Sequence, residues 1–138
     1  MAEHTLILLR HAKSDWSGDE ADIDRPLASR GRGQAPEAGR WLATHVDRTD
    51  MAVVSAAERA RATWDLVSAD LGERPETRHD EHVYAASAVA LLDIVHSLGE
   101  ELKTVVLVGH NPGLEDLAET LTGERARLPT SALAVIDL

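Results

Sequence analysis

Arg10 and His11 follow directly after an apolar run at residues 5–9. Such a short run of Leu, Ile and Thr is typical of a buried strand. Residues at the end of a strand lie at the carboxyl edge of its sheet, where open α/β folds bind ligands. A guanidinium presents a planar set of donors to a phosphate group, and a histidine is a nucleophile and a proton carrier near neutral pH. The pair therefore indicates phosphate chemistry at a strand end.

Two further basic groups stand at equivalent places along the chain. Arg59 lies in the first turns of the helix expected after the second strand, and His110 directly follows the fourth expected strand. The strand-to-helix junctions of a parallel sheet open at one edge, so these groups are expected to meet the first pair in one pocket. Helix N-termini at that edge add N–H donors for an anion. The arrangement predicts a site for a tetrahedral phosphate dianion.

Alternating strand and helix patterns position these junctions. Strands are expected at residues 5–9, 51–54, 76–79 (a weak edge strand), 104–108 and 132–138. Helices are expected after the N-cap residues Ser55 and Asn111, at residues 88–98, and near residues 30–46, where Pro36 favours an irregular first turn or a start after Arg30. This alternation predicts an α/β protein, a three-layer α/β/α sandwich with a mostly parallel central sheet.

Size, composition and charge narrow the class of protein. The 138 residues favour one domain over residues 1–138, and the absence of cysteine excludes disulfides and a cysteine nucleophile. A net charge of −10 disfavours nucleic acid and anionic membranes as partners. No apolar run approaches the length of a membrane span, and the first residues lack the basic region of a signal peptide. A cytoplasmic location is therefore expected.

Three stretches of the chain carry a family pattern. They are Arg10-His11-Ala12, residues 55–63 with Arg59-Ala60 and Thr63, and Val108-Gly109-His110-Asn111-Pro112-Gly113, supported by Arg25-Pro26-Leu27 with Gly31 and by residues 84–87. Together they resemble the histidine phosphatase superfamily, which includes the cofactor-dependent phosphoglycerate mutases, and above all its small SixA-type phosphohistidine phosphatase branch. The resemblance runs from about Leu6 to Gly123 and implies a phosphoglycerate mutase-like fold. Alanine stands at position 12, where the family usually has glycine, and is small enough to leave the pocket open.

The resemblance also implies roles for the residues at the junctions. His11 would attack phosphorus in line and form a phosphohistidine intermediate. Arg10, Arg59 and His110 would bind the phosphoryl oxygens and stabilise the transition state, with Asn111 as a further substrate-binding residue. No metal or other cofactor is implied, because side chains supply the positive charge.

The leaving-group acid and the place of Arg25 are open. The family commonly carries a carboxylate between the third strand and the next helix, where Glu81 is preferred here and Asp80 or no acid are the alternatives. Arg25 is expected either to reach the pocket rim as a substrate-binding residue or only to pair with Asp22 or Asp24.

The branch implies phosphohistidine on a protein partner as the substrate. Short loops, with no insertion long enough for a deep lid, agree with an open site. The same chemistry could serve a small phosphorylated metabolite, and a phosphate-binding module without turnover is a third alternative. A mutase is disfavoured because short loops give little means of retaining an intermediate.

Overall fold

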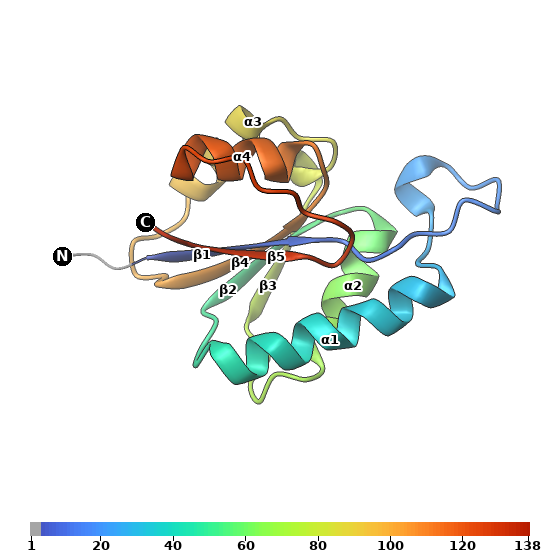
Figure 1. Cartoon of the computed structure of the whole chain (residues 1–138), viewed down its shortest axis with the longest axis horizontal. Coiled ribbons are helices and arrows are strands. Elements are labelled where there is room, and N and C mark those ends of the chain that lie inside the picture. The colour runs from blue at the N-terminus through green and yellow to red at the C-terminus, as the bar shows by residue number, and fades with distance from the viewer. Residues whose placement is uncertain (1–3) are drawn as a thin grey trace.

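The computed structural model describes residues 4–138, which form a five-stranded sheet between two layers of helices (Figure 1). The strands are β1 (Thr5–Arg10), β2 (Met51–Ser55), β3 (Glu76–Asp80), β4 (Thr104–Gly109) and β5 (Leu133–Asp137). Their spatial order is β3-β2-β4-β1-β5, and only β5 runs antiparallel to its neighbour. The predicted sandwich and its mostly parallel sheet are confirmed, as is the place of β3 at an edge.

The helices cover the two faces of the sheet in pairs. They are α1 (Ser29–His45), α2 (Glu58–Ser68), α3 (Ala88–His96) and α4 (Gly113–Thr122). In Figure 1, α1 and α2 lie below the sheet and α3 and α4 above it. Within residues 4–138, no helix is long and apolar enough to cross a membrane.

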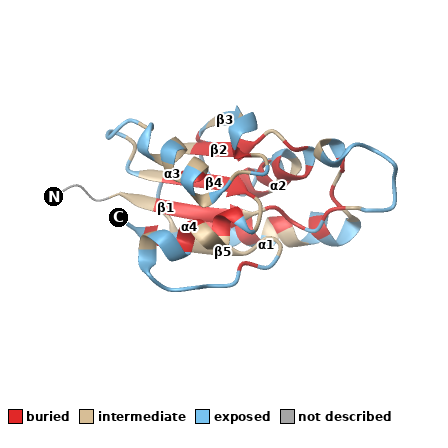
Figure 2. Cartoon of the chain, turned by 90° about the horizontal axis from the view of Figure 1, so that it is seen from above, coloured by how far each residue is buried: buried red, intermediate tan, exposed pale blue. Residues whose placement is uncertain are grey.

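The central strands supply the core on both faces, which Figure 2 shows as buried segments between exposed helix surfaces. Ile7 and Leu9 of β1 pack in the cluster between the sheet and helices α1 and α2. Leu6 and Leu8 pack in the cluster between the sheet and helices α3 and α4. This division follows from the alternation of side chains along a strand. Burial on both faces explains why the strand reads as a continuous apolar run and not as an alternating one.

Parallel pairing brings the ends of three strands to one edge of the sheet. β4 lies between β1 and β2 and runs parallel to both, with Arg10 opposite Gly109 and Val54 opposite Val108. The residues that follow these strands therefore lie beside one another, although about 100 positions separate the first junction from the last. The pairing of β4 with β1 and β2 therefore explains why the three junctions can share one site.

The first helix differs from its expected form at Pro36. The helix begins at Ser29 and continues through Pro36 to His45. Proline removes one backbone hydrogen bond inside a helix. Ala35 and Ala38 on either side of it are buried in the core, and their packing holds the helix together across the missing bond.

Both expected helix caps are wrong. Ser55 is the last residue of β2, and α2 begins at Glu58 after Ala57. Asn111 stands outside α4, whose N-cap position is Pro112. The side chains of Ser55 and Asn111 form long-range hydrogen bonds instead, because both lie where the strand ends converge.

Candidate active site

A cavity of about 260 Å³ opens at the carboxyl edge of the sheet. Its lining consists of Arg10, His11, Lys13, Ser14, Trp16, Asp22, Arg25, Arg59, His110, Asn111 and Thr130. The structure thus brings the basic residues of all three junctions together, as the topology argument expects. The segment between β1 and α1 supplies most of the remaining wall, with Thr130 from the segment before β5, and the first of these segments extends beyond the sheet in Figure 1.

His11 lies at the floor of the cavity with 8% of its surface exposed. Its Nδ1 atom is 2.8 Å from the carbonyl oxygen of Ala12, which places the proton on Nδ1 and leaves the lone pair on Nε2. Burial lowers the pKa of His11 to about 4, and the nearby charges of Arg59 and Arg10 act in the same direction. The imidazole is therefore neutral at physiological pH and has a free nucleophilic nitrogen.

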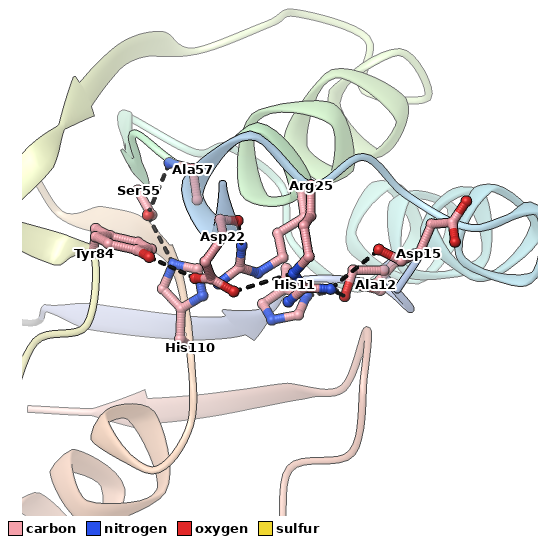
Figure 3. A network of polar contacts seen from close by, with 11 residues as sticks. His11, Ala12, Asp15, Asp22, Arg25, Ser55, Ala57, Tyr84 and His110 are labelled. Carbon is pink, nitrogen blue, oxygen red and sulfur yellow. Dashed lines mark hydrogen bonds and ion pairs between the residues drawn. The ribbon is translucent and has the colours of Figure 1, made fainter. Parts of the chain in front are cut away.

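His110 faces His11, with 5.1 Å between the ring centroids. Its Nε2 atom lies 2.7 Å from Ser55 Oγ, and because this oxygen accepts a hydrogen bond from the N–H of Ala57, its own hydroxyl proton can be donated to His110 (Figure 3). Burial lowers the pKa of His110 to about 3, and the neighbouring His11 and Arg59 act in the same direction, so this ring is neutral too. Ser55 therefore acts at the cavity as a partner of His110.

Arg10 and Asn111 share an anchor in the segment between α4 and β5. Arg10 Nη1 donates to the carbonyl oxygen of Leu128 at 3.0 Å, and Asn111 Nδ2 donates to the same oxygen at 2.7 Å. Leu128 is itself buried, so the shared carbonyl belongs to the packed part of the molecule. The sequence patterns gave no sign of this anchor, because Leu128 lies outside every motif.

Arg59 is 6% exposed and binds the loop across the cavity. Its Nη1 donates to the backbone oxygen of Asp22 at 2.7 Å, and its Nη2 donates to Asp22 Oδ2 at 3.1 Å. Arg61, two positions along the helix, is exposed. The helical periodicity of α2 thus directs only the first of these arginines into the site.

Asp22 is the hub of the polar network in Figure 3. Besides Arg59, its carboxylate accepts hydrogen bonds from Arg25 Nε at 3.1 Å and from the hydroxyl of Tyr84. The hydrogen bond from Tyr84, together with the two arginines, lowers the pKa of Asp22 to about 2. Among the residues that line the cavity, Asp22 is the one carboxylate. From the sequence, Asp22 is expected only as one possible partner of Arg25.

Arg25 reaches the cavity, so it does not only pair with a neighbouring aspartate. It lines the cavity, and it also pairs with Asp22 and donates to Ser14 Oγ at 2.8 Å. Its guanidinium carbon lies 3.4 Å from the centroid of the Trp16 ring, and that ring is 70% exposed at the rim. Such a contact holds the aromatic ring in place at the mouth of the site.

Glu81 does not reach the cavity. It lies in the short 3-10 turn η2 (Glu81–Val83), is exposed, and is absent from the lining. The neighbouring alternative, Asp80, instead accepts hydrogen bonds from Arg78 and from the backbone of His82. The turn directs Tyr84 toward the site, so the structure does not support either carboxylate as the leaving-group acid.

Several buried polar atoms of the described lining residues have no protein partner. They are Arg10 Nε, Arg59 Nε, His110 Nδ1 and Asn111 Oδ1. Leaving a buried polar group unsatisfied costs about 1–3 kcal/mol. Three nitrogens of this kind around one cavity fit a ligand with several acceptor oxygens.

Comparisons with known proteins define the class. The sequence profile of the histidine phosphatase superfamily (branch 1) matches residues 6–83. An uncharacterized protein of Mycobacterium tuberculosis is 34% identical over 139 aligned positions, which cover 93% of this chain and 85% of that protein. The chain belongs to the histidine phosphatase superfamily. It is accordingly a phosphatase that uses a histidine nucleophile.

Solved structures confirm the phosphoglycerate mutase-like fold and the SixA-type branch. A crystal structure assigned as the phosphohistidine phosphatase SixA of Agrobacterium tumefaciens is 31% identical, with a TM-score of 0.90 over 97% of this chain and 91% of that one. The protein histidine phosphatase SixA complexed with tungstate superposes with a TM-score of 0.86 at 21% identity, over 95% of this chain and 86% of that one. At 21% identity, the similarity to the tungstate complex is a similarity of fold alone.

Proposed function

We propose that this chain removes the phosphoryl group from phosphohistidine on a partner protein, without a metal ion, through a phosphohistidine formed on its own His11. The observation that carries the proposal is the convergence of a neutral imidazole, with a free Nε2 lone pair, and unpartnered buried nitrogens on one cavity. This is the arrangement that an in-line attack on phosphorus requires.

His11 is prepared for attack by its hydrogen bond to Ala12. The bond keeps the proton on Nδ1 and holds the ring in one orientation. A covalent intermediate on Nε2 splits the transfer to water into two displacements. In the second displacement a water molecule attacks the phosphorus and releases His11.

Arg10, Arg59 and His110 supply the contacts to the phosphoryl oxygens. The two guanidiniums carry fixed positive charge, and each has an Nε–H without a partner. Neutral His110 accepts from Ser55 at Nε2 and so presents an N–H at Nδ1. Charge-assisted donors of this kind stabilise the transferring group in place of a metal ion.

An open rim favours a phosphoryl group carried by a macromolecule. The side chain of Asp22 is 48% exposed and Trp16 is 70% exposed, so the mouth of the cavity faces solvent. The relative of 31% identity is named as a phosphohistidine phosphatase. A P–N bond to imidazole is labile, so the modest depth of the site is sufficient for such a substrate.

The test compares a phosphohistidine-bearing domain with sugar and glycerate phosphates in the presence of a chelator. We expect turnover of the protein substrate and a phosphoryl group on His11 by mass spectrometry, both absent in His11→Ala. His96→Ala is the matched control, because His96 is exposed at the end of α3.

Three outcomes would contradict the proposal. Preference for small esters would make the chain a metabolite phosphatase. Phosphate binding without any phosphoenzyme would make it a binding module. Loss of activity in chelator would show a metal requirement.

A further inference from the structure

Asp22 has no role in the chemistry described above, although it is the carboxylate within the cavity lining. We propose that Asp22 is a further catalytic residue that donates a proton to the leaving atom. When the phosphoryl group enters, Arg59 exchanges its hydrogen bonds to Asp22 for hydrogen bonds to that group, and Asp22 then takes up the proton. This inference rests on the proposed function and names the proton donor that Glu81 does not provide.

The depth of the two groups places Asp22 on the leaving-group side. His11 lies at the floor with 8% exposure, whereas the Asp22 side chain is 48% exposed. In-line displacement requires the leaving atom to lie opposite the attacking nitrogen. A substrate attacked from the floor therefore directs its leaving group toward the mouth, where Asp22 stands.

Arg59 links the charge of Asp22 to the presence of substrate. In the free site, Arg59 Nη2 is 3.1 Å from Asp22 Oδ2 while Arg59 Nε has no partner. A phosphoryl dianion is a stronger competitor for this guanidinium than a carboxylate, because it offers more charge and more acceptor oxygens. Its arrival both weakens the ion pair and adds like charge beside Asp22.

Both effects raise the affinity of Asp22 for a proton. In the free site the pKa of Asp22 is held at about 2 by Tyr84 and the arginines. A neighbouring like charge and the loss of a cationic partner each disfavour the carboxylate. Tyr84 stays in place as an orienting group, since its ring packs edge-on against His110 at 5.6 Å. Substrate binding thus favours the protonated form of Asp22.

The proton and the bonds balance over one turnover. The lone pair of His11 Nε2 forms a bond to phosphorus as the bond from phosphorus to the leaving atom breaks, and the Asp22 proton passes to that atom. In the second step water attacks phosphorus, the bond to His11 breaks, and the Asp22 carboxylate accepts a proton from the water. Asp22 therefore acts first as acid and then as base.

The experiment compares Asp22→Asn with Asp24→Asn on two aryl phosphates. Asp24 lies in the same 3-10 turn η1 (Asp22–Asp24) and is exposed, so it controls for charge and for the loop. For phenyl phosphate, whose leaving group needs a proton, we expect Asp22→Asn to lower kcat by about 10²- to 10⁴-fold. For p-nitrophenyl phosphate, whose leaving group does not, we expect a loss of less than about tenfold.

Three further readouts separate proton transfer from a positioning role. The alkaline limb of the kcat profile should disappear in Asp22→Asn and shift upward in Tyr84→Phe, because Tyr84 stabilises the carboxylate. Inorganic phosphate should inhibit Asp22→Asn at lower concentration than the wild type, because one negative charge has left the cavity. Asp22→Glu should recover part of the phenyl phosphate activity.

Equal losses on both esters with weaker phosphate binding would overturn the inference, as would an equal effect of Asp24→Asn. If Asp22→Asn does not fold, the shift in Tyr84→Phe and the recovery in Asp22→Glu decide the matter. Labelling of wild-type His11 by p-nitrophenyl phosphate is measured first, and its failure would count against the proposed function independently of Asp22.

Discussion

Individual side chains of the site owe their charge states to their surroundings. His11 and His110 are neutral because burial and neighbouring arginines oppose protonation, whereas Asp22 is ionised because three donors surround it. At their ordinary pKa values, the His and Asp side chains would not differ so clearly in charge state. Position in the fold therefore assigns the proposed roles of nucleophile, donor and acid.

Arg59 and Arg61 provide a matched test at this scale. We expect Arg59→Ala to lower kcat for p-nitrophenyl phosphate by about 10³- to 10⁵-fold, the range for an arginine that stabilises a transferring phosphoryl group. Arg61→Ala should leave it unchanged, because Arg61 is exposed. Steady-state kinetics of the two variants makes the comparison, and similar losses in both would exclude a specific role for Arg59.

At the scale of elements, the loop after β1 is seated on the first turn of α1. Lys13 accepts a hydrogen bond from the N–H of Ala28 at 2.9 Å, and its carbonyl oxygen lies where a Cβ on Gly31 would stand. Glycine at position 31 thus permits the backbone contact that places this wall of the cavity.

Gly31→Ala and Gly33→Ala should therefore have opposite effects. The first forces two backbone segments apart, and we expect a loss of about 1–3 kcal/mol in the free energy of unfolding together with reduced activity. A Cβ at Gly33 meets nothing within 4 Å, so the second should stabilise α1 by about 0.5–1 kcal/mol without affecting kcat. Urea denaturation and kinetics report both, and a neutral Gly31→Ala would refute the seating of the loop.

The whole molecule should lose stability in mild acid because of its buried imidazoles. The pKa of His11 is about 4 in the folded chain against 6.5 ordinarily, so between these values the unfolded chain binds more protons. Stability is then full above about pH 6.5 and falls below it, by about 2 kcal/mol from His11 at about pH 5. The stabilisation from Asp22 has the same sign, because its pKa is also lower in the folded chain, but it is lost only below its ordinary pKa of 3.8 and so does not contribute at about pH 5.

His11→Asn isolates this contribution. Unfolding measured at about pH 7.5 and about pH 5 should show a smaller decrease for the variant than for the wild type, by about 2 kcal/mol. Equal decreases in the two proteins would mean that His11 titrates normally in the folded chain.

The helices and strands could be predicted from the sequence because their formation depends on residues that are close along the chain. The apolar run of β1 and the positions of Arg10, His11 and His110 at strand ends follow from local pattern and parallel topology. The helix ends were less well predicted: α2 begins at Glu58 and not directly after Ser55, and α4 begins after Pro112 and not after Asn111. There, helix propensity competes with turn and tertiary contacts.

The acid was beyond sequence reasoning for a physical reason. The loop before α1 contains several carboxylates, and nothing in their spacing distinguishes Asp22. Its selection depends on donors from Arg25, Arg59 and Tyr84, the last 62 positions away. The family's position for a carboxylate, between the third strand and the next helix, favours Glu81, but the turn exposes this residue.

Hydrophobic periodicity and the spacing of basic residues were thus sufficient for the layered fold and for the convergence of three basic junctions, and the resemblance of the motifs was sufficient for the family. Only the tertiary structure singles out Asp22 among the carboxylates of its loop. It also makes Ser55 a hydrogen-bond partner of His110 and not a helix cap. It brings the Leu128 carbonyl to Arg10 and Asn111. The difference lies in range: strand and helix patterns repeat over a few residues, whereas these polar contacts join segments whose distance is set by the packing of the entire chain.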